Sequence, residues 1–152
     1  MNEQTLKMMF SSKRQDWTTP QYIFDELNKE FSFTLDAASS DKNTKCDRHF
    51  TEEQNGLEQS WKGERVFINP PFGRGLWRWY QKAYQETRDS AEIVVMLVPA
   101  RTDTSYWHDY AMKGEIRFIR GRLTFGDSKI SAPFPSAIVI FRKPAPSGKQ
   151  EK

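Results

Sequence analysis

The sequence predicts a single α/β domain whose mostly parallel sheet has helices on both faces and an antiparallel edge strand. Short β-branched and aromatic runs alternate with stretches of helical periodicity, the pattern of a parallel sheet covered by crossover helices. The 152 residues are the length of one domain, and 11 Phe, 5 Trp and 5 Tyr provide ample core material. The last two expected strands are joined by a loop rather than a helix, which predicts antiparallel pairing at that edge.

The individual elements follow from periodicity and from helix-start signals. The first is a helix that begins at Thr18-Thr19-Pro20, where a Thr caps the helix and Pro occupies its first turn. Four apolar residues then share one helical face: Ile23, Phe24, Leu27 and Phe31. The later elements are a strand at 33–38, a weaker strand at 46–51, a strand at 66–69, a helix at 76–88, a strand at 92–98, a helix at 104–112, and strands at 116–119 and 137–141.

The two ends are expected to lie outside the folded domain. Residues 1–14 predict a flexible lead-in, residues 15–142 the domain, and residues 143–152 a disordered polar tail that is rich in Pro and Lys. The single cysteine, Cys46, excludes an internal disulfide framework and suits a reducing compartment. The sequence has no secretory signal and no run of about 20 apolar residues, so we expect a cytoplasmic protein that does not enter a membrane.

The charge balance is compatible with a nucleic-acid partner but does not establish one. The chain carries 23 basic and 20 acidic residues, a net charge of +3. Seven of the basic residues that follow residue 72 are of interest, and several of these lie in predicted loops beside aromatic residues. A solvated rim and a groove that follows phosphates explain them equally well. They are Arg74, Arg78, Arg101, Arg117, Arg120, Arg122 and Lys129.

The most informative motif is Asn69-Pro70-Pro71-Phe72, which directly follows the apolar run at 65–68. The carboxyl ends of strands are where open α/β sheets bind ligands. The Asn69 side chain and the Pro70 carbonyl, which Pro71 restricts, can accept both hydrogen bonds of an exocyclic amino group, and Phe72 can stack on its ring. Those bonds favour a pyramidal nitrogen with a free lone pair, so the tetrad predicts an adenine methyltransferase. The plainer alternative is a turn that ends a strand.

The chain resembles the phage and prophage DNA N6-adenine methyltransferase (Dam-type) family over residues 11–142. Three blocks, in this order and at these separations, carry the resemblance: Asp16-Trp17-Thr18-Thr19-Pro20, Leu35-Asp36-Ala37-Ala38-Ser39 and Asn69-Pro70-Pro71-Phe72. The resemblance implies a Rossmann-like methyltransferase fold and S-adenosylmethionine as the methyl donor. It also implies double-stranded DNA as partner, with the target adenine flipped out of the duplex. A phage-encoded member would act in the host cytoplasm.

The same resemblance implies which residues bind the donor and which catalyse transfer. The segment that holds the donor's methionine carboxylate matches Trp17, Thr18, Thr19 and Pro20, and free N–H groups at a helix start favour a carboxylate. A simple helix cap explains the Thr residues equally well. The loop that packs against the donor matches Asp36, Ala37 and Ala38, and it departs from the glycine-rich consensus of many methyltransferases. The catalytic residues are Asn69, Pro70, Pro71 and Phe72, with Asn69 also next to the donor.

Other contacts stay open at this point. Asp47, Glu52 or Glu53 is expected to bind the donor's ribose hydroxyls, and Asn55 stands where an Asp commonly meets its adenine. Phe125 or Phe134, in the late segment expected near the target base, is either the opposite stacking face or a core residue. His49, His108 and Cys46 lack the spacing of metal ligands, so no metal site is predicted.

Two kinds of rival function remain. A related enzyme would methylate RNA adenine, cytosine N4 or a protein glutamine, because each presents a planar nitrogen to the same acceptors. The Arg-rich and aromatic-rich second half favours nucleic acid over glutamine. A non-catalytic phage protein would keep the fold only to bind nucleic acid. Recognition is expected from short loops at 73–78, 101–106 and 120–135, while the target sequence and the oligomeric state are left open.

Overall fold

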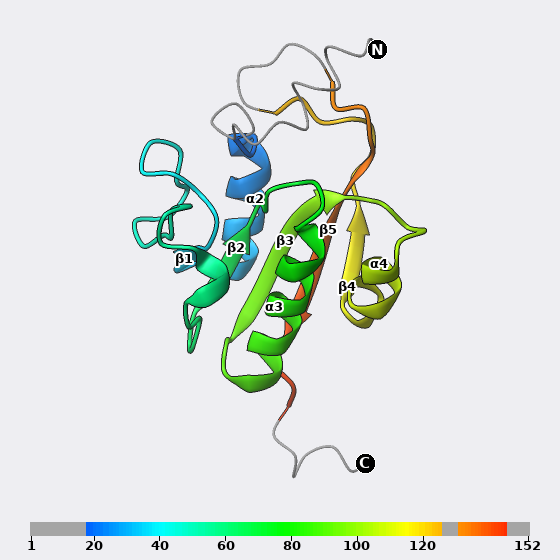
Figure 1. The fold of residues 1–152 in the computed structure, drawn as a ribbon. Helices are drawn as coiled ribbons and strands as arrows, with labels where there is room; N and C mark the ends of the chain where they lie inside the picture. Colours follow the sequence, from blue (N-terminus) through cyan, green and yellow to red (C-terminus); the bar gives the residue numbers. More distant parts are fainter. Residues whose placement is uncertain (1–17, 126–130, 146–152) are drawn as a thin grey trace.

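A computed structural model describes residues 18–125 and 131–145, which form an α/β unit (Figure 1). Within these ranges a five-stranded sheet has the order β1-β2-β3-β5-β4. The strands are β1 (Leu35–Asp36), β2 (Arg65–Ile68), β3 (Ile93–Pro99), β4 (Glu115–Phe118) and β5 (Ser136–Arg142). The helices are α2 (Gln21–Phe31), α3 (Leu76–Asp89) and α4 (Ser105–Asp109), with short 3₁₀ turns η2 (Gly56–Glu58) and η3 (Ala111–Lys113).

The sheet is mixed rather than mostly parallel. β1 pairs with β2 and β2 with β3 in parallel, whereas β5 runs antiparallel to both β3 and β4. The expected antiparallel pairing of the last two strands is confirmed, but β5 lies inside the sheet and β4 forms its edge. Burial explains this order, because six of the seven β5 residues are buried while all four β4 residues are at least partly exposed.

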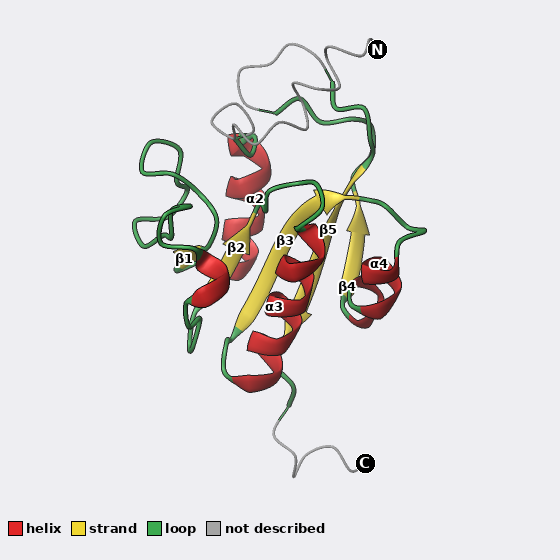
Figure 2. Cartoon of the chain, viewed as in Figure 1, coloured by secondary structure: helices red, strands yellow, loops and turns green. Residues whose placement is uncertain are grey.

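Helices cover both faces of the sheet, as the sequence predicts (Figure 2). Alternate residues of β2 and β3 point to opposite sides, so Val66 and Met96 pack with α3 while Phe67 and Val95 pack with α2. The apolar face expected for α2 is confirmed by its three buried residues, with Ile23 packed against them in part: Phe24, Leu27 and Phe31.

Several of the element boundaries expected from the sequence are wrong. Pro20, not a Thr, is the N-cap of α2, and no side chain caps that helix. The strand expected at 33–38 shrinks to the two residues of β1, and the segment at 46–51 contributes only a single bridge from His49 to Asp36. The helix expected at 104–112 is divided at Tyr110 into α4 and η3.

The expected lead-in at 1–14 lies outside the described residues, as does most of the expected tail at 143–152, so both boundaries of the domain stay predictions. In the part of the chain that the structure describes, none of the helices is long and apolar enough to cross a membrane.

Candidate active site

A cavity of about 840 Å³ lies at the carboxyl ends of β1 and β2. Because these two strands are parallel, the residues that follow them meet at one edge of the sheet. The cavity walls come from the start of α2, the loop after β1, the segment at 51–56 and the tetrad after β2. Figure 1 shows the start of α2 and the long loop after β1 on the same side of the molecule as the end of β2.

The tetrad reaches this cavity directly from β2. Asn69 is 6% exposed and lines the cavity together with Pro71 and Phe72, while Pro70 is buried behind them. The next residue, Gly73, has a φ of +109°, a backbone conformation that other residues adopt only with strain. This turn sends the chain into α3, so Gly73 fixes how the tetrad is presented.

Two buried rings hold Phe72 in place. The centroid of Phe72 lies 5.4 Å from that of Phe134 and 6.1 Å from that of Phe125, at interplanar angles of 87° and 76°. A base between two rings needs parallel planes about 7 Å apart, twice the van der Waals separation of carbon atoms. Nearly perpendicular rings at these distances leave no such slot. Of the two roles left open for Phe125 and Phe134, the structure favours the core role.

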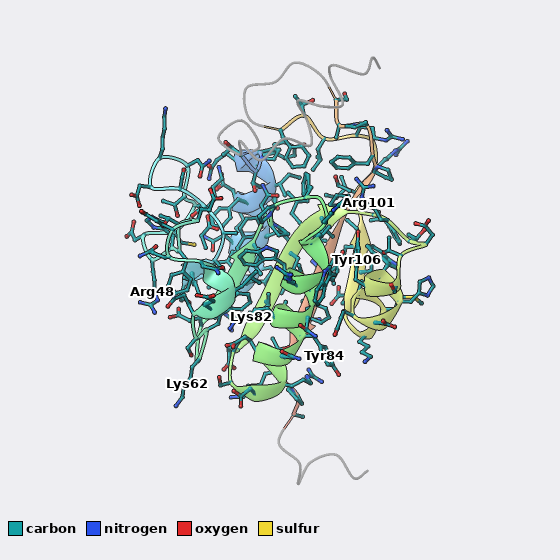
Figure 3. The ribbon with its side chains drawn as sticks, viewed as in Figure 1. Arg48, Lys62, Lys82, Tyr84, Arg101 and Tyr106 are labelled. Carbon is teal, nitrogen blue, oxygen red and sulfur yellow. The ribbon has the colours of Figure 1, made fainter. Side chains whose placement is uncertain are left out.

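Arg101 extends this aromatic cluster towards the surface. Its guanidinium carbon lies 5.8 Å from the ring centroid of Phe134. Arg101, labelled in Figure 3, follows β3. Because β3 is the parallel neighbour of β2, Arg101 lies at the edge of the sheet where β2 ends. A basic side chain therefore stands behind the rings that support Phe72.

The start of α2 forms another wall of the cavity. Thr18 and Thr19 both line it, and Thr19 is only 4% exposed. Pro20 is the N-cap and is not among the lining residues, while Trp17 lies outside the described residues. In the first turn Pro20 has no N–H, and the Ile23 N–H donates to the Pro20 carbonyl at 3.1 Å, so Gln21 and Tyr22 supply the N–H groups that the helix start can offer to an anionic group.

A buried carboxylate faces the cavity at the end of β1. Asp36 is 3% exposed, and its Oδ2 accepts a hydrogen bond of 2.9 Å from the backbone N–H of Lys45. Burial raises the pKa of Asp36 from 3.8 to about 6, although the backbone N–H groups of Lys45 and Ala38 act in the opposite direction. A cation bound beside this carboxylate would offset the cost of burying its charge.

The loop after β1 is held close to the segment at 55–57. A Cβ on Gly56 would lie 2.2 Å from the carbonyl oxygen of Ala37, so only glycine allows this approach. Gly56 lines the cavity, as does Ala38, whereas Ala37 is fully buried. Asn55 does not line the cavity, and its Oδ1 accepts a hydrogen bond of 3.1 Å from the N–H of Leu57. Asn55 therefore stabilises the turn that places Gly56 against Ala37.

The three acidic residues considered for the donor's ribose differ in whether they line the cavity. Glu52 and Glu53 line the cavity and are exposed, whereas Asp47 is exposed and is not among the lining residues. The cavity position therefore favours the two glutamates.

Lys45 and Trp79 are among the lining residues that sequence reasoning missed. Trp79 is 7% exposed and stacks on Trp61 with centroids 6.5 Å apart. The spacing of Trp79 from Leu76 does place it on the buried face of α3, but sequence alone does not show that this face reaches the cavity. Lys45 lies in a polar loop without periodicity, and no sequence signal singles it out.

The cavity lining is divided by charge. Its described acidic residues all come from β1 and the segments that follow it: Asp36, Asp41, Glu52 and Glu53. Arg74 lies on the tetrad side. The first turn of α3 carries Trp77, 42% exposed, and the guanidinium of Arg78 lies 5.3 Å from the Trp77 ring. The acidic side, which Lys45 also lines, therefore suits a ligand that carries cationic groups, and the other side suits phosphate.

The histidines have other partners. His49 Nε2 lies 2.7 Å from Oδ1 of Asp41, and His108 Nε2 lies 2.8 Å from the carbonyl oxygen of Thr102. Within residues 18–125 and 131–145, no three His, Cys, Asp or Glu side chains form a group that could hold a metal ion.

Comparison with known proteins identifies the family. The family model described as DNA N-6-adenine-methyltransferase (Dam) matches residues 7–147, which is most of the chain. The chain belongs to this family. A DNA N-6-adenine-methyltransferase of Escherichia phage T1 is 31% identical over 114 residues, covering 73% of this chain and 47% of the phage protein. The chain thus spans about half the length of that relative.

Membership in the Dam family confirms the resemblance found in the three sequence blocks. The family implies a Rossmann-like methyltransferase fold. The Dam-family tetrad and the expected donor-binding blocks contribute Asn69, Asp36 and Thr19 to one cavity.

Proposed function

We propose that this chain transfers a methyl group from S-adenosylmethionine to N6 of an adenine flipped out of double-stranded DNA. The observation that carries the proposal is the shared cavity. Asn69 and Phe72, which suit a flipped adenine, line the same cavity as Asp36 and Thr19, which suit the donor. Methyl transfer requires donor and acceptor side by side, so a common cavity is the arrangement that the reaction needs.

The cavity fits the donor in size and in chemistry. Its volume of about 840 Å³ falls within the roughly 300–1,000 Å³ of small-molecule sites. The carboxylate of Asp36 suits the donor's cationic centres, the start of α2 suits its carboxylate, and Glu52 or Glu53 suits the ribose hydroxyls. When bound, the donor supplies an electrophilic methyl group.

The tetrad prepares the acceptor nitrogen. We assign the Oδ1 of Asn69 and the carbonyl of Pro70 to accept hydrogen bonds from the two N6 hydrogens, which localises the lone pair on that nitrogen. Phe72 stacks on the base, and its edge-on contacts with Phe125 and Phe134 fix the ring before the base arrives. Position and electrostatics, rather than a general base, then carry the transfer.

The basic side of the cavity is assigned to the DNA backbone. Arg74 lines the cavity, Trp77 and Arg78 are exposed on the first turn of α3, and Arg101 lies at the same sheet edge. Recognition through the short loops at 73–78, 101–106 and 120–135 predicts a short or relaxed target sequence. Mapping methylated adenines across a genome checks this, and a long asymmetric consensus would count against it.

Transfer of radiolabelled methyl from S-adenosylmethionine tests the substrate class. Duplex DNA, single-stranded DNA, RNA and a glutamine-containing peptide are compared at equal acceptor concentration. Label in duplex DNA, recovered as N6-methyladenine, supports the proposal. Label confined to RNA, to cytosine or to the peptide would identify one of the rival methyltransferases. A protein that shows no transfer to any acceptor and no thermal stabilisation by S-adenosylmethionine would instead be the non-catalytic nucleic-acid-binding rival.

A further inference from the structure

Lys45 connects three parts of the donor side of the cavity. Its backbone N–H donates to Oδ2 of Asp36 at 2.9 Å, and its Nζ donates to Oε1 of Gln21 at 2.7 Å. Gln21 is the first residue of α2 and directly follows the Thr18–Pro20 segment. Lys45 itself lines the cavity, as do Thr18 and Thr19. The ammonium group is therefore placed at the start of α2, beside the wall that suits an anionic group.

The charge of Lys45 is poorly compensated by the protein. The ion pairs among the described residues do not include it, and the side chain that accepts its hydrogen bond is the neutral amide of Gln21. Burial lowers the pKa of Lys45, and the carboxylates of Asp36 and Asp25 only partly counteract this. An anionic ligand beside Nζ would stabilise the charged form.

Lys45 and Arg74 are the basic residues among those described as lining the cavity. Arg74 belongs to the tetrad side, so Lys45 is the cation of the donor side. Asp36, the buried carboxylate of the same side, is tied to the backbone of Lys45. A carboxylate and an ammonium group on one wall match a zwitterion, a ligand with its own ammonium and carboxylate groups. A free α-amino acid end is such a ligand.

We propose that Lys45 Nζ binds the α-carboxylate of the donor's methionine moiety while Asp36 binds its α-ammonium, so that the two residues select a donor with an intact amino-acid end. The inference rests on the proposed function, because that function supplies the donor. Thr18, Thr19 and the first turn of α2 provide neutral hydrogen-bond donors, and Lys45 adds the charge. Lys45 is thus a specificity-determining residue, and a donor that lacks the carboxylate is discriminated against.

Calorimetric titration with three ligands tests this assignment. The ligands are S-adenosylhomocysteine, its decarboxylated analogue, which keeps the amine, and its deaminated analogue, which keeps the carboxylate. They are titrated into the wild type, Lys45→Met and the control Lys42→Met, since Lys42 is an exposed lysine of the same loop that does not line the cavity.

We expect Lys45→Met to weaken binding of the two carboxylate-containing ligands by roughly 10- to 100-fold, the loss of one charge-assisted hydrogen bond. Binding of the decarboxylated analogue should change little, and Lys42→Met should bind all three ligands like the wild type. Asp36→Asn should show the complementary pattern, with its losses confined to the two amine-containing ligands.

Equal losses for all three ligands in Lys45→Met, or no loss for any of them, would overturn the assignment. Lys45→Arg keeps the charge and guards against a folding defect, so it should still prefer the carboxylate-containing ligands. A wild-type protein that binds S-adenosylhomocysteine without preferring it to the decarboxylated analogue would refute the inference and leave the proposed function standing. A wild type that binds none of the ligands would refute both.

Discussion

The pH dependence of donor binding follows from the buried carboxylate of Asp36. Burial raises the pKa of Asp36 from 3.8, its ordinary value and the one expected in the unfolded chain, to about 6 in the folded protein. Between pH 4 and 6 the folded protein therefore holds a proton that the unfolded chain releases. The free energy of unfolding of the ligand-free protein falls as pH rises through this window, by about 3 kcal/mol in total. Above pH 6 the carboxylate is ionised and the contribution is constant.

Burial favours the protonated form of Asp36, whereas binding of a cationic donor favours the ionised carboxylate. At pH 7 about nine-tenths of the Asp36 side chains are ionised, and at pH 5 about one-tenth, for a pKa of about 6. We therefore expect the Kd for S-adenosylhomocysteine to rise about tenfold between pH 7 and pH 5. Lys45 and His49 also interact with Asp36, and the raised pKa of His49 arises first from its hydrogen bond to Asp41.

Isothermal titration calorimetry at pH 5, 6, 7 and 8, with wild type and Asp36→Asn, measures this effect. The wild type should follow the titration of one carboxyl group, and Asp36→Asn should bind more weakly at pH 7 with a nearly flat profile. Any slope that survives in the variant belongs to groups other than Asp36, such as His49, whose pKa is raised first by the hydrogen bond to Asp41 and also by the charge of Asp36. A wild-type Kd that stays constant from pH 7 to pH 5 would show that Asp36 does not pair with the donor's cation.

Three further substitutions test the support of the site. Gly56→Ala places a Cβ against the carbonyl oxygen of Ala37, so it should lower the free energy of unfolding by about 1–3 kcal/mol in thermal melts and weaken donor binding. A Cβ on Gly75 would have no atom within 4 Å, so Gly75→Ala should change little in the same melts. Phe134→Ala removes a buried ring beside Phe72 and should lower the free energy of unfolding in denaturant by about 3–5 kcal/mol. Among molecules that remain folded, the KM for DNA should rise more than the KM for the donor. Equal changes in the two KM values would argue against the role of Phe134 in holding Phe72. Arg78→Ala should weaken DNA binding and reduce by about 1 the magnitude of the slope of the logarithm of the binding constant against the logarithm of the salt concentration. Lys62→Ala, at the end of β2 opposite to the tetrad (Figure 3), should leave this slope unchanged. An unchanged slope in Arg78→Ala would remove Arg78 from the DNA interface.

The location of the tetrad could be predicted because local signals agree there. An apolar run precedes Asn69, and Gly73 and Gly75 follow the two prolines, so the strand, the turn and the helix are each specified within ten residues. The buried face of α2 was equally clear from its spacing. These are local features, and local features determine most of the wall that we assign to the flipped base.

The rest of the cavity depends on contacts between distant segments. β5 was expected near the edge, but whether it lies inside or outside β4 depends on which strand can be buried on both sides, and only the assembled sheet shows that. The donor side joins Lys45 to Gln21 and to Asp36 through a loop without regular structure, so periodicity gives no register for it. The Thr residues before α2 look like caps in sequence, whereas in the fold they line the cavity and Pro20 is the N-cap.

The most direct test of the central claim is mass spectrometry of nucleosides from duplex DNA treated with S-adenosylmethionine that carries a deuterated methyl group. The wild type and Lys62→Ala should produce deuterated N6-methyldeoxyadenosine at the same rate. Asn69→Ala, at saturating donor, should be slower by roughly 10²- to 10³-fold, the cost of removing one positioned electrostatic group. Deuterated product from Asn69→Ala at the wild-type rate would contradict the account, because the side chain at the end of β2 would then take no part in methyl transfer.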